Sequence, residues 1–403
     1  MKKLTFLFIV LASSMLCYAQ NPQWMIFTNG YQINAIAEEG NTMWVCTGSG
    51  LLSIDKTPGD LTFYNPTNSG LPYNYVSSIA IDGSGNKWIG TYRGLAKFDG
   101  TNWTVYDTTN SGLPDNAITS IAIDESGNKW IGTYFGGLSK FDGTNWTVYN
   151  TTNSGLPYNY LYSIAIDGSG TKWIGTYEGV TKFDGTNWIT YNKLNSGLSG
   201  NYVYSIAIDE YGVKWIGTHD GGLAKFDGTN WTVYNTTNSG LPNNHVLSIA
   251  IDGSDNKWIG TYFGGMAKFN GTKWTVYNIA NSGLPDNDVY SIAIDGNGTK
   301  WIGTANGLAA FNENGIPSDV KDNILSNYNV SVFPNPASDY LKIEQNEANI
   351  SLIKIINLQG QVIKSQRILG NQSTLNLTNV SAGVYILKIY TNSGFVVKKL
   401  IKK

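Results

Sequence analysis

The stretch Val76-Ser77-Ser78-Ile79-Ala80-Ile81-Asp82, followed closely by Lys87-Trp88-Ile89-Gly90-Thr91, decides the fold because near-copies of it occur seven times. The tryptophans of the seven copies follow one another at intervals of 42 to 44 residues. A period of this size predicts an array of small units that bury their faces against one another. The tryptophans are Trp44, Trp88, Trp130, Trp173, Trp215, Trp258 and Trp301.

Each repeat predicts four short antiparallel strands. In the second copy, residues 76–82 alternate large and small side chains, and residues 87–91 form the next strand after a Gly-Ser-Gly-Asn turn. A third strand over 95–99 ends in Asp-Gly, a favoured hairpin start, and 103–106 is the fourth. Four strands repeated radially predict a β-propeller with seven blades.

The strand count also predicts how the ring closes. The first three strands occur seven times, but the fourth occurs only six times within the array, and the last repeat ends at Phe311 without one. A matching segment, Trp24-Met25-Ile26-Phe27, precedes the first repeat. We therefore expect this N-terminal strand to complete the last blade and leave no free edge. Cys46, which replaces the usual glycine, is expected to be a small buried strand residue.

The repeated pattern Gly-Leu-Pro, Val-x-Ser-Ile-Ala-x-Asp-x-x-Gly-x-x-Trp-Ile-Gly-Thr and Gly-Leu resembles the two-component regulator propeller family over about residues 22–312. The resemblance implies an extracytoplasmic propeller like those of hybrid two-component sensors, many of which concern polysaccharides. The sequence shows no membrane span, kinase or DNA-binding domain, so we do not expect this chain to signal alone.

The segment after the array has a different composition. A polar linker covers 312–329, and from residue 330 nine Lys and Arg face three acidic residues, whereas residues 20–329 hold 16 against 26. Short strand patterns and hairpin turns predict a small immunoglobulin-like β-sandwich over 330–403. The predicted strands are 340–344, 351–357, 362–367, 374–377, 384–390 and 395–401.

This tail resembles the type A C-terminal sorting domain of the type IX secretion system. The matching residues are Pro334-Asn335-Pro336-Ala337, Gly360, the run from Gly383 to Ile389 and the basic end Lys398–Lys403. The resemblance implies that residues 330–403 engage the secretion machinery and direct passage through the outer membrane. An adhesive sandwich with a solvated basic end is the alternative. Nucleic-acid binding is not expected from so small a charge excess on an exported chain.

The N-terminus predicts export. Residues 1–19 combine Lys2 and Lys3 with a short apolar run and a small-residue cleavage site, which is typical of a signal peptide. Bulky Leu16 before Cys17 disfavours lipid attachment, and no segment is long and apolar enough to span a membrane. We expect a secreted or outer-membrane surface protein that reaches its location through the periplasm.

The repeats differ mainly in two sets of loops. The turns after the first and third strands are nearly identical, whereas the loops after the second and fourth strands vary and share the other face. We call these faces the turn face and the variable face. The candidate ligand-binding residues lie in the variable loops: Tyr75, Tyr92, Arg93, Tyr134, Phe135, Tyr160, Tyr177, Glu178, Tyr202, His219, Asp220, His245, Tyr262 and Phe263.

Aromatic rings mixed with amides and carboxylates suit a carbohydrate, whose ring faces stack and whose hydroxyls need hydrogen-bond partners. They also suit a surface protein. The alternative is that the tyrosines only pack over the bases of the loops. The single propeller arginine, Arg93, is too few for a sialidase-like carboxylate site.

An enzyme is the second hypothesis. A polysaccharide lyase could use His219, His245 and Tyr262 as acid and base, and a glycosidase pair cannot be singled out because most Asp residues occupy turns. The two histidines alone do not make a metal site, and calcium binding by Asp220, Asp286 or Asp288 is nonspecific. We expect no cofactor and no metal.

The sequence therefore predicts a non-catalytic, exported propeller that binds a glycan or a surface partner, and acts as a monomer. A polysaccharide-active enzyme and a protein-interaction scaffold are the alternatives. The predicted parts are a signal peptide over 1–19, a propeller over 20–311, a linker over 312–329 and a sorting sandwich over 330–403.

Overall fold

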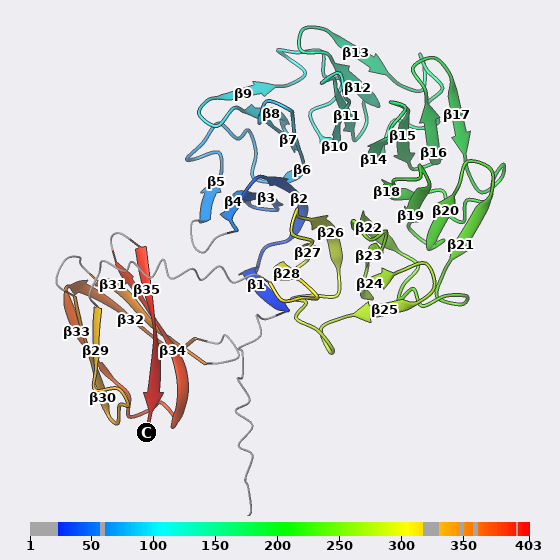
Figure 1. The fold of residues 1–403 in the computed structure, drawn as a ribbon. Coiled ribbons are helices and arrows are strands. Elements are labelled where there is room, and N and C mark those ends of the chain that lie inside the picture. The colour runs from blue at the N-terminus through cyan, green and yellow to red at the C-terminus, as the bar shows by residue number, and fades with distance from the viewer. Residues whose placement is uncertain (1–22, 57–60, 317–329, 346–349, 358–361, 392–393) are drawn as a thin grey trace, which may run out of the picture. The chain divides into compact units, whose positions relative to one another are not determined.

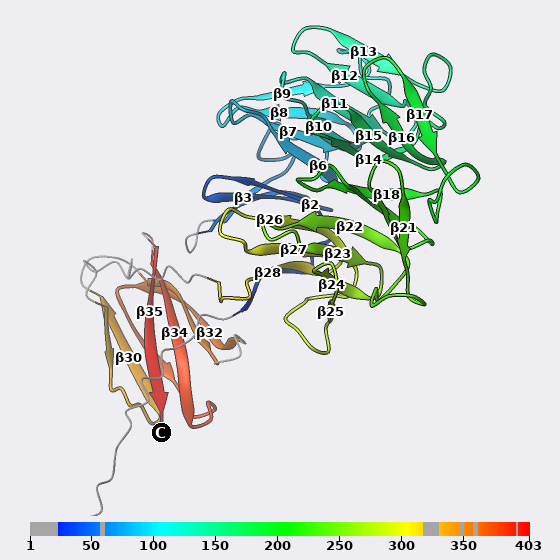
Figure 2. The same ribbon diagram turned by 45° about the vertical axis from the view of Figure 1, so that its right-hand side comes forward.

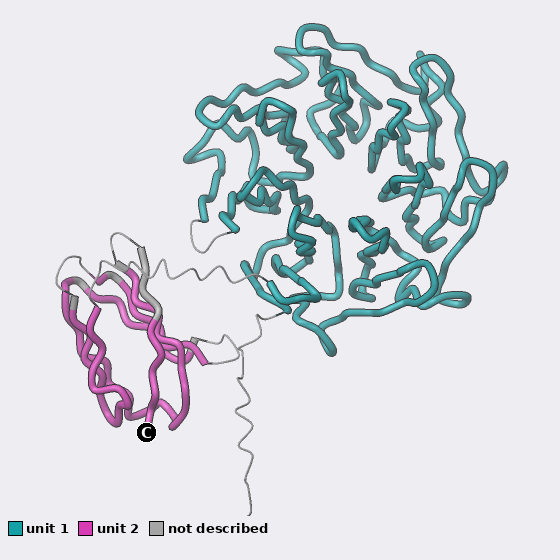
Figure 3. Tube along the Cα trace, in the orientation of Figure 1, with its two compact units in different colours: residues 1–317 teal, residues 318–403 magenta. Residues whose placement is uncertain are grey.

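The computed structural model describes residues 23–56, 61–316, 330–345, 350–357, 362–391 and 394–403. It divides into two compact units, residues 1–317 and 318–403 (Figure 3). The expected signal peptide, the linker beyond residue 316 and Gly360 lie outside the described residues. Every regular element among the described residues is a strand, and none of these residues forms a helix that could cross a membrane.

The first unit is a ring of seven four-stranded antiparallel sheets (Figure 1). Blade 1 contains β2 (Ile33–Glu39), β3 (Thr42–Thr47), β4 (Gly50–Asp55) and β5 (Leu61–Tyr64). Blade 2 contains β6 (Val76–Ile81), β7 (Lys87–Thr91), β8 (Gly94–Phe98) and β9 (Trp103–Tyr106). Blade 3 contains β10 (Ile118–Ile123), β11 (Lys129–Thr133), β12 (Leu138–Phe141) and β13 (Trp146–Tyr149).

The remaining blades repeat the same order of strands. Blade 4 contains β14 (Leu161–Ile166), β15 (Lys172–Thr176), β16 (Gly179–Phe183) and β17 (Trp188–Tyr191). Blade 5 contains β18 (Val203–Ile208), β19 (Lys214–Thr218), β20 (Leu223–Phe226) and β21 (Trp231–Tyr234). Blade 6 contains β22 (Val246–Ile251), β23 (Lys257–Thr261), β24 (Gly265–Phe269) and β25 (Trp274–Tyr277). Blade 7 contains β26 (Val289–Ile294), β27 (Lys300–Thr304), β28 (Gly307–Phe311) and β1 (Trp24–Asn29).

The N-terminal strand completes the last blade, as the sequence predicted. β1 pairs antiparallel with β28, and the Trp24 ring stacks on Phe311 with 4.4 Å between centroids. The fourth-strand tryptophan of blade 2, Trp103, stacks on Phe98 at the same 4.4 Å. Trp24 therefore occupies the place that the fourth-strand tryptophan takes in a contiguous blade, and the ring closes without an unpaired edge on β28.

Close contacts between blades explain why the second strand of most blades contains a glycine. A Cβ atom on Gly90 would lie 2.7 Å from Ile118 of the next blade, so a side chain here would require the neighbouring blade to shift. Cys46 stands at the equivalent place in blade 1 and is fully buried, as predicted, and burial raises the pKa of its thiol. Burying a large aliphatic or aromatic side chain contributes roughly 1.5–3 kcal/mol, and each junction between blades buries a separate hydrophobic cluster.

A lysine crosses most junctions on the turn face. Lys300 of blade 7 lies 4.6 Å from the Trp258 ring centroid and 3.7 Å from the Asp252 carboxylate of blade 6. Asp252 also accepts a 2.8 Å hydrogen bond from the Trp258 indole. Met43 holds the lysine position in blade 1, and there Lys56 reaches Asp295 of blade 7 at 3.7 Å instead. At the junction between blades 7 and 1, the bridging cation therefore comes from the end of the third strand, whereas in the other junctions it comes from the start of the second strand.

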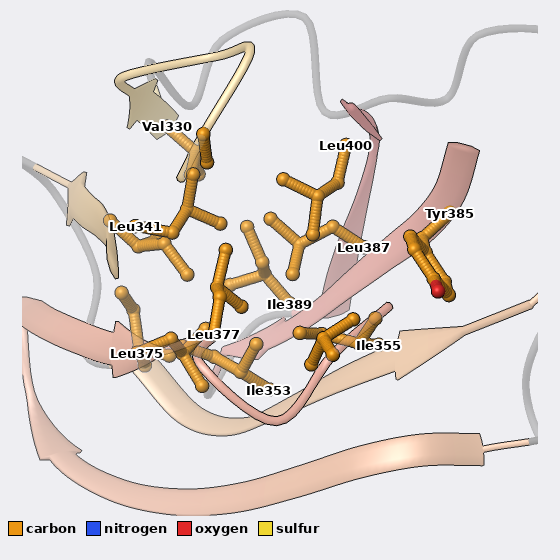
Figure 4. Close-up of a cluster of buried hydrophobic side chains, with 14 residues drawn as sticks. Val330, Leu341, Ile353, Ile355, Leu375, Leu377, Tyr385, Leu387, Ile389 and Leu400 are labelled. Atoms are coloured by element: carbon orange, nitrogen blue, oxygen red, sulfur yellow. The ribbon is translucent and has the colours of Figure 1, made fainter. Parts of the chain in front are cut away.

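The second unit is a small β-sandwich, which confirms that part of the prediction. One sheet orders its strands β29–β30–β33 and the other β32–β31–β34–β35, and both contribute to one buried cluster (Figures 2 and 4). The first sheet contains β29 (Val330–Phe333), β30 (Tyr340–Gln345) and β33 (Gln372–Asn376). The second contains β31 (Ile350–Ile356), β32 (Val362–Gly370), β34 (Gly383–Thr391) and β35 (Gly394–Lys402).

The Pro-Asn-Pro-Ala segment is fixed to the last strand of the sandwich. The Asn335 amide oxygen accepts a hydrogen bond from Ile401 N at 2.9 Å, and Ala337 N donates to Ile401 O at 2.8 Å. Lys403 N donates in turn to Ala337 O at 2.8 Å. The two ends of the sorting segment therefore form one structural element, although they are far apart in sequence.

Candidate functional site

Backbone hydrogen bonds hold the loops of the variable face in place, and these bonds do not depend on the side chains of the loops. The first strands of neighbouring blades lie side by side at the centre of the ring (Figure 1). In several blades, the residue after the second strand donates its N–H to the residue just before the first strand. Examples are Tyr134 N to Ala117 O at 2.9 Å and His219 N to Tyr202 O at 3.0 Å. These paired positions carry most of the predicted site residues.

Side chains from these positions stack across the junctions between blades. Tyr134 of blade 3 lies 3.9 Å from Tyr160 of blade 4, between ring centroids. Tyr177 and Tyr202 of the next junction lie 3.8 Å apart, and their hydroxyls are hydrogen-bonded at 2.7 Å. This hydrogen bond is the main reason that the pKa of Tyr202 is raised to about 12.

The two histidines of the chain meet at the junction of blades 5 and 6. The ring centroids of His219 and His245 are 4.1 Å apart, and His245 also lies 5.1 Å from Tyr262. Burial, and then the neighbouring His219, lower the pKa of His245 to about 4. His245 is therefore neutral at physiological pH, and its Nε2 is buried without a hydrogen-bond partner in the described structure.

Three tyrosines at the centre of the ring were missed by sequence reasoning. The pairing of each first strand with its second shifts register at one residue, which bulges out of the ladder. Tyr162, Tyr204 and Tyr290 occupy this bulge in blades 4, 5 and 7, whereas blades 1 to 3 have Asn34, Ser77 and Thr119. The signal was present, because this position varies among otherwise similar strands, but we interpreted it as part of the regular alternation.

The bulge tyrosines join the loop residues into one cluster. Tyr162 lies 4.3 Å from Tyr160 and 4.5 Å from Tyr204, and Tyr204 lies 5.1 Å from His245, between ring centroids. Contacts of this kind run without interruption from blade 3 to blade 6. We call the set the inner aromatic cluster: Tyr134, Tyr160, Tyr162, Tyr204, His219, His245 and Tyr262.

Burial and neighbouring phenols raise the pKa of three tyrosine hydroxyls of this cluster above the usual value. Burial is the largest cause that raises the pKa of Tyr160, Tyr162 and Tyr204, and nearby tyrosines add to it for each of them. The hydroxyls consequently act as neutral donors and acceptors at physiological pH. An amphipathic surface of this kind suits a ligand with both apolar faces and hydroxyl groups.

Two phenylalanines flank the cluster and project into solvent. Phe135 is 72% exposed and lies 4.4 Å from Tyr134, and Phe263 is 66% exposed and lies 3.9 Å from Tyr262. Asp115 accepts a hydrogen bond from Phe135 N, and Asp288 accepts one from Phe263 N. Phe263 has a φ of 58°, a left-handed conformation that is uncommon for a bulky residue.

The other predicted residues lie outside the cluster. Tyr75 and Tyr92 stack on each other at 4.6 Å in blade 2, where burial raises the pKa of Tyr75 to about 12. Arg93 lies over the Tyr73 ring at 5.0 Å from the centroid. Glu178 and Asp220 are exposed and act electrostatically on Tyr202. The inner aromatic cluster therefore contains five of the fourteen predicted residues, and the other nine lie outside it.

Two of the three carboxylates considered for calcium binding accept hydrogen bonds from the backbone. Asp288 accepts the N–H of Phe263, and Asp286 accepts that of Asp288 at 2.9 Å. No group of three or more His, Cys, Asp or Glu is arranged to hold a metal within the described part of the chain.

Family models match two parts of the chain. The secretion system C-terminal sorting domain matches residues 331–403, and the two component regulator propeller matches residues 112–135 and 283–306. Both resemblances drawn from the sequence are thus confirmed. The sorting domain indicates secretion or display at the cell surface through the type IX system. None of the curated proteins matches the sequence.

Several solved structures share the fold. The extracellular domain of the putative hybrid two component system BT3049 from B. thetaiotaomicron has a TM-score of 0.64 at 21% identity, over 94% of this chain and 57% of its own. PorZ, described as an essential surface component of the type-IX secretion system of Porphyromonas gingivalis, has a TM-score of 0.57 at 19% identity, over 91% and 59%. The chain thus spans about three-fifths of these two structures.

The structure of a lyase also matches over nearly its whole length. Virginiamycin B lyase from Staphylococcus aureus has a TM-score of 0.58 at 15% identity, over 72% of this chain and 97% of its own. At these identities the likeness concerns the fold alone.

Proposed function

We propose that this protein is a non-catalytic binding module, displayed at the cell surface or secreted, whose inner aromatic cluster binds a glycan. The observation that carries the proposal is the uninterrupted run of stacked tyrosine and histidine rings from blade 3 to blade 6. Sugar rings stack on such faces, and protonated phenols donate to and accept from sugar hydroxyls. Phe135 and Phe263 would extend the contact at either end.

The arrangement of the two faces supports this assignment. Side chains of the turn face are used in repeated hydrogen bonds and junction contacts, as with Asp252 and Lys300. Side chains of the inner aromatic cluster contact mainly one another, and the loops that carry them are tied by backbone bonds. The backbone hydrogen bonds hold these loops without help from the aromatic side chains, which supports a role of those side chains in recognition.

The test is a binding screen of the purified protein against neutral and acidic plant, algal and host oligosaccharides, read by thermal shift and calorimetry. A ligand that binds only the folded state raises the melting temperature by mass action. We expect a shift that is lost in Tyr204→Ala and kept in Tyr211→Ala, because Tyr211 is 74% exposed in a turn on the opposite face. Absence of binding to any sugar would refute the glycan assignment and favour a protein partner.

A lyase is a second candidate function. The specific observation is that the only two histidines of the chain, His219 and His245, contact each other beside Tyr262. A neutral imidazole next to phenols can accept and return a proton. Virginiamycin B lyase shares the fold, and a histidine-to-alanine variant of that enzyme is described as catalytically inactive. New chain ends in a bound oligosaccharide, lost in His245→Gln, would favour the enzyme over the binding module.

A further inference from the structure

The charged side chains of the propeller are distributed unevenly, because most of its cations lie away from the variable face. In the loops of the variable face, six carboxylates stand against two cations, Arg93 and Lys193. The other thirteen of the fifteen described propeller Lys and Arg lie in the second and third strands or in the turns of the opposite face. The six carboxylates are Asp107, Asp115, Glu178, Asp220, Asp286 and Asp288.

Four of these carboxylates act directly on residues in or beside the inner aromatic cluster. Glu178 and Asp220 both act electrostatically on Tyr202, and Asp220 also acts on His245. Asp286 and Asp288 act in the same way on the bulge residue Tyr290. The cluster therefore lies in a negative field that comes from blades 4, 5 and 7.

The cations do not cancel this field. The Arg93 guanidinium lies over the Tyr73 ring of blade 2 and not over a ring of the cluster. Lys193 is exposed in the loop that leads from blade 4 to blade 5, and its backbone is bonded to Asn201. The lysines that contact tryptophans, such as Lys300 and Lys129, cross the junctions on the turn face. Recognition of a carboxylate or sulfate usually relies on an arginine or lysine in contact with it, and the cluster contains none.

We propose that the inner aromatic cluster selects a neutral glycan and rejects polymers that bear uronate or sulfate groups. This inference rests on the proposed function and adds the chemical class of its ligand. Tyr162 and Tyr204 provide the central stacking surface and hydroxyl partners. Glu178, Asp220, Asp286 and Asp288 provide the discrimination, because like charges that face each other across an interface oppose binding.

The experiment compares matched polymers of one backbone by calorimetry on the full protein. Methyl-esterified homogalacturonan oligosaccharides are compared with their de-esterified forms, and dextran with dextran sulfate. We expect the neutral member of a pair to bind at least about tenfold more tightly than the charged member at low salt, with the difference reduced at high salt by screening. Equal or tighter binding of the charged member would overturn the inference while leaving the proposed function intact.

Absence of binding by these polymers and by every sugar of the screen would overturn the proposed function itself, and the selectivity with it. A double variant, Glu178→Gln with Asp220→Asn, separates charge from shape. We expect it to strengthen binding of the charged polymer several-fold at low salt, and so to narrow the difference in affinity between the neutral and the charged polymer. Glu125→Gln is the matched control, because Glu125 is an exposed carboxylate of the turn face. If the control had the same effect as the double variant, net charge rather than local charge would be responsible, and the inference would be wrong.

Discussion

The turn face and the variable face arise from the same seven repeats but use their side chains in opposite ways. On the turn face, each second-strand tryptophan donates to an acidic residue, from Glu39 in blade 1 to Asp295 in blade 7, at 2.8 to 3.1 Å. On the variable face, the position after each second strand holds tyrosine, histidine, alanine or glycine, and the loops are fixed by backbone hydrogen bonds. The stabilising contacts and the proposed recognition thus use different positions of one repeat, and we expect that one can change without the other.

Deleting residues 24–29 should have the largest effect, because β1 supports blade 7 on both faces. The deletion removes Trp24, Met25 and Phe27 from partly buried positions and exposes the edge of β28. We expect the free energy of unfolding to fall by on the order of 5 kcal/mol, which lowers the melting temperature by roughly 10 °C or more. Calorimetric melting measures it, with Ile26→Ala as the control, since Ile26 is 49% exposed. An unchanged melting temperature would contradict the closure.

Asp252→Ala tests the turn face alone. The substitution leaves the buried indole of Trp258 and the Lys300 ammonium without their shared acceptor. We expect a loss of about 2–4 kcal/mol in unfolding free energy, because buried polar groups are left unsatisfied. Chemical denaturation gives the value, and ligand affinity should stay at the wild-type level. Weakened binding together with lost stability would show that the two faces are coupled.

Lowering the pH should reduce the stability of the folded protein through the protonation of His245. Its pKa is lowered to about 4 in the folded protein, whereas an unfolded histidine titrates near 6.5. The unfolded state therefore binds the proton first, and the stability that is fully present above pH 6.5 is lost as the pH falls towards 4. Melting temperatures of the wild type and His245→Gln should converge over this window. If the two melting temperatures differed by the same amount at every pH, the pKa of His245 would not be lowered in the folded protein, and the prediction would be wrong.

Phe263→Gly should have the smallest effect on stability. We expect it to stabilise the fold, although removal of an apolar side chain usually destabilises a protein. At a φ of 58° a bulky residue is strained, so glycine should stabilise the fold by about 1 kcal/mol. Phe135→Gly is the matched control, because Phe135 is equally exposed but does not have a positive φ, and there glycine should be neutral or destabilising. Both variants should weaken glycan binding if the two rings flank the ligand.

The sequence predicted the architecture because repetition averages out local ambiguity. A single Lys-Trp-Ile-Gly-Thr strand is a weak signal, but seven of them at one period leave few alternatives, and the missing fourth strand pointed to Trp24–Phe27. The sequence shows Met43 at the position where the other blades have lysine. That Lys56 takes over the contact with Asp295 depends on distances across the closing junction. Such distances do not follow from the pattern of a single repeat.

The candidate site was predicted only in part, for a related reason. The variable loops were identified by comparing copies, which located His219 and His245 on one face. Their direct contact depends on the offset between neighbouring blades, which places the loop of one blade beside the next first strand. Tyr162 and Tyr204 were missed because a bulge reverses the side on which a strand residue lies.

The pairing of β1 with β28 has a consequence for the order of events in folding. Thr28 and Leu308 are hydrogen-bonded although 280 residues separate them. During synthesis or export from the N-terminus, β1 emerges first but has no partner until nearly the whole ring has followed. Contacts of such long range form late and slowly. The six contiguous blades can therefore assemble as they emerge, while the first strand of the chain is the last to be incorporated.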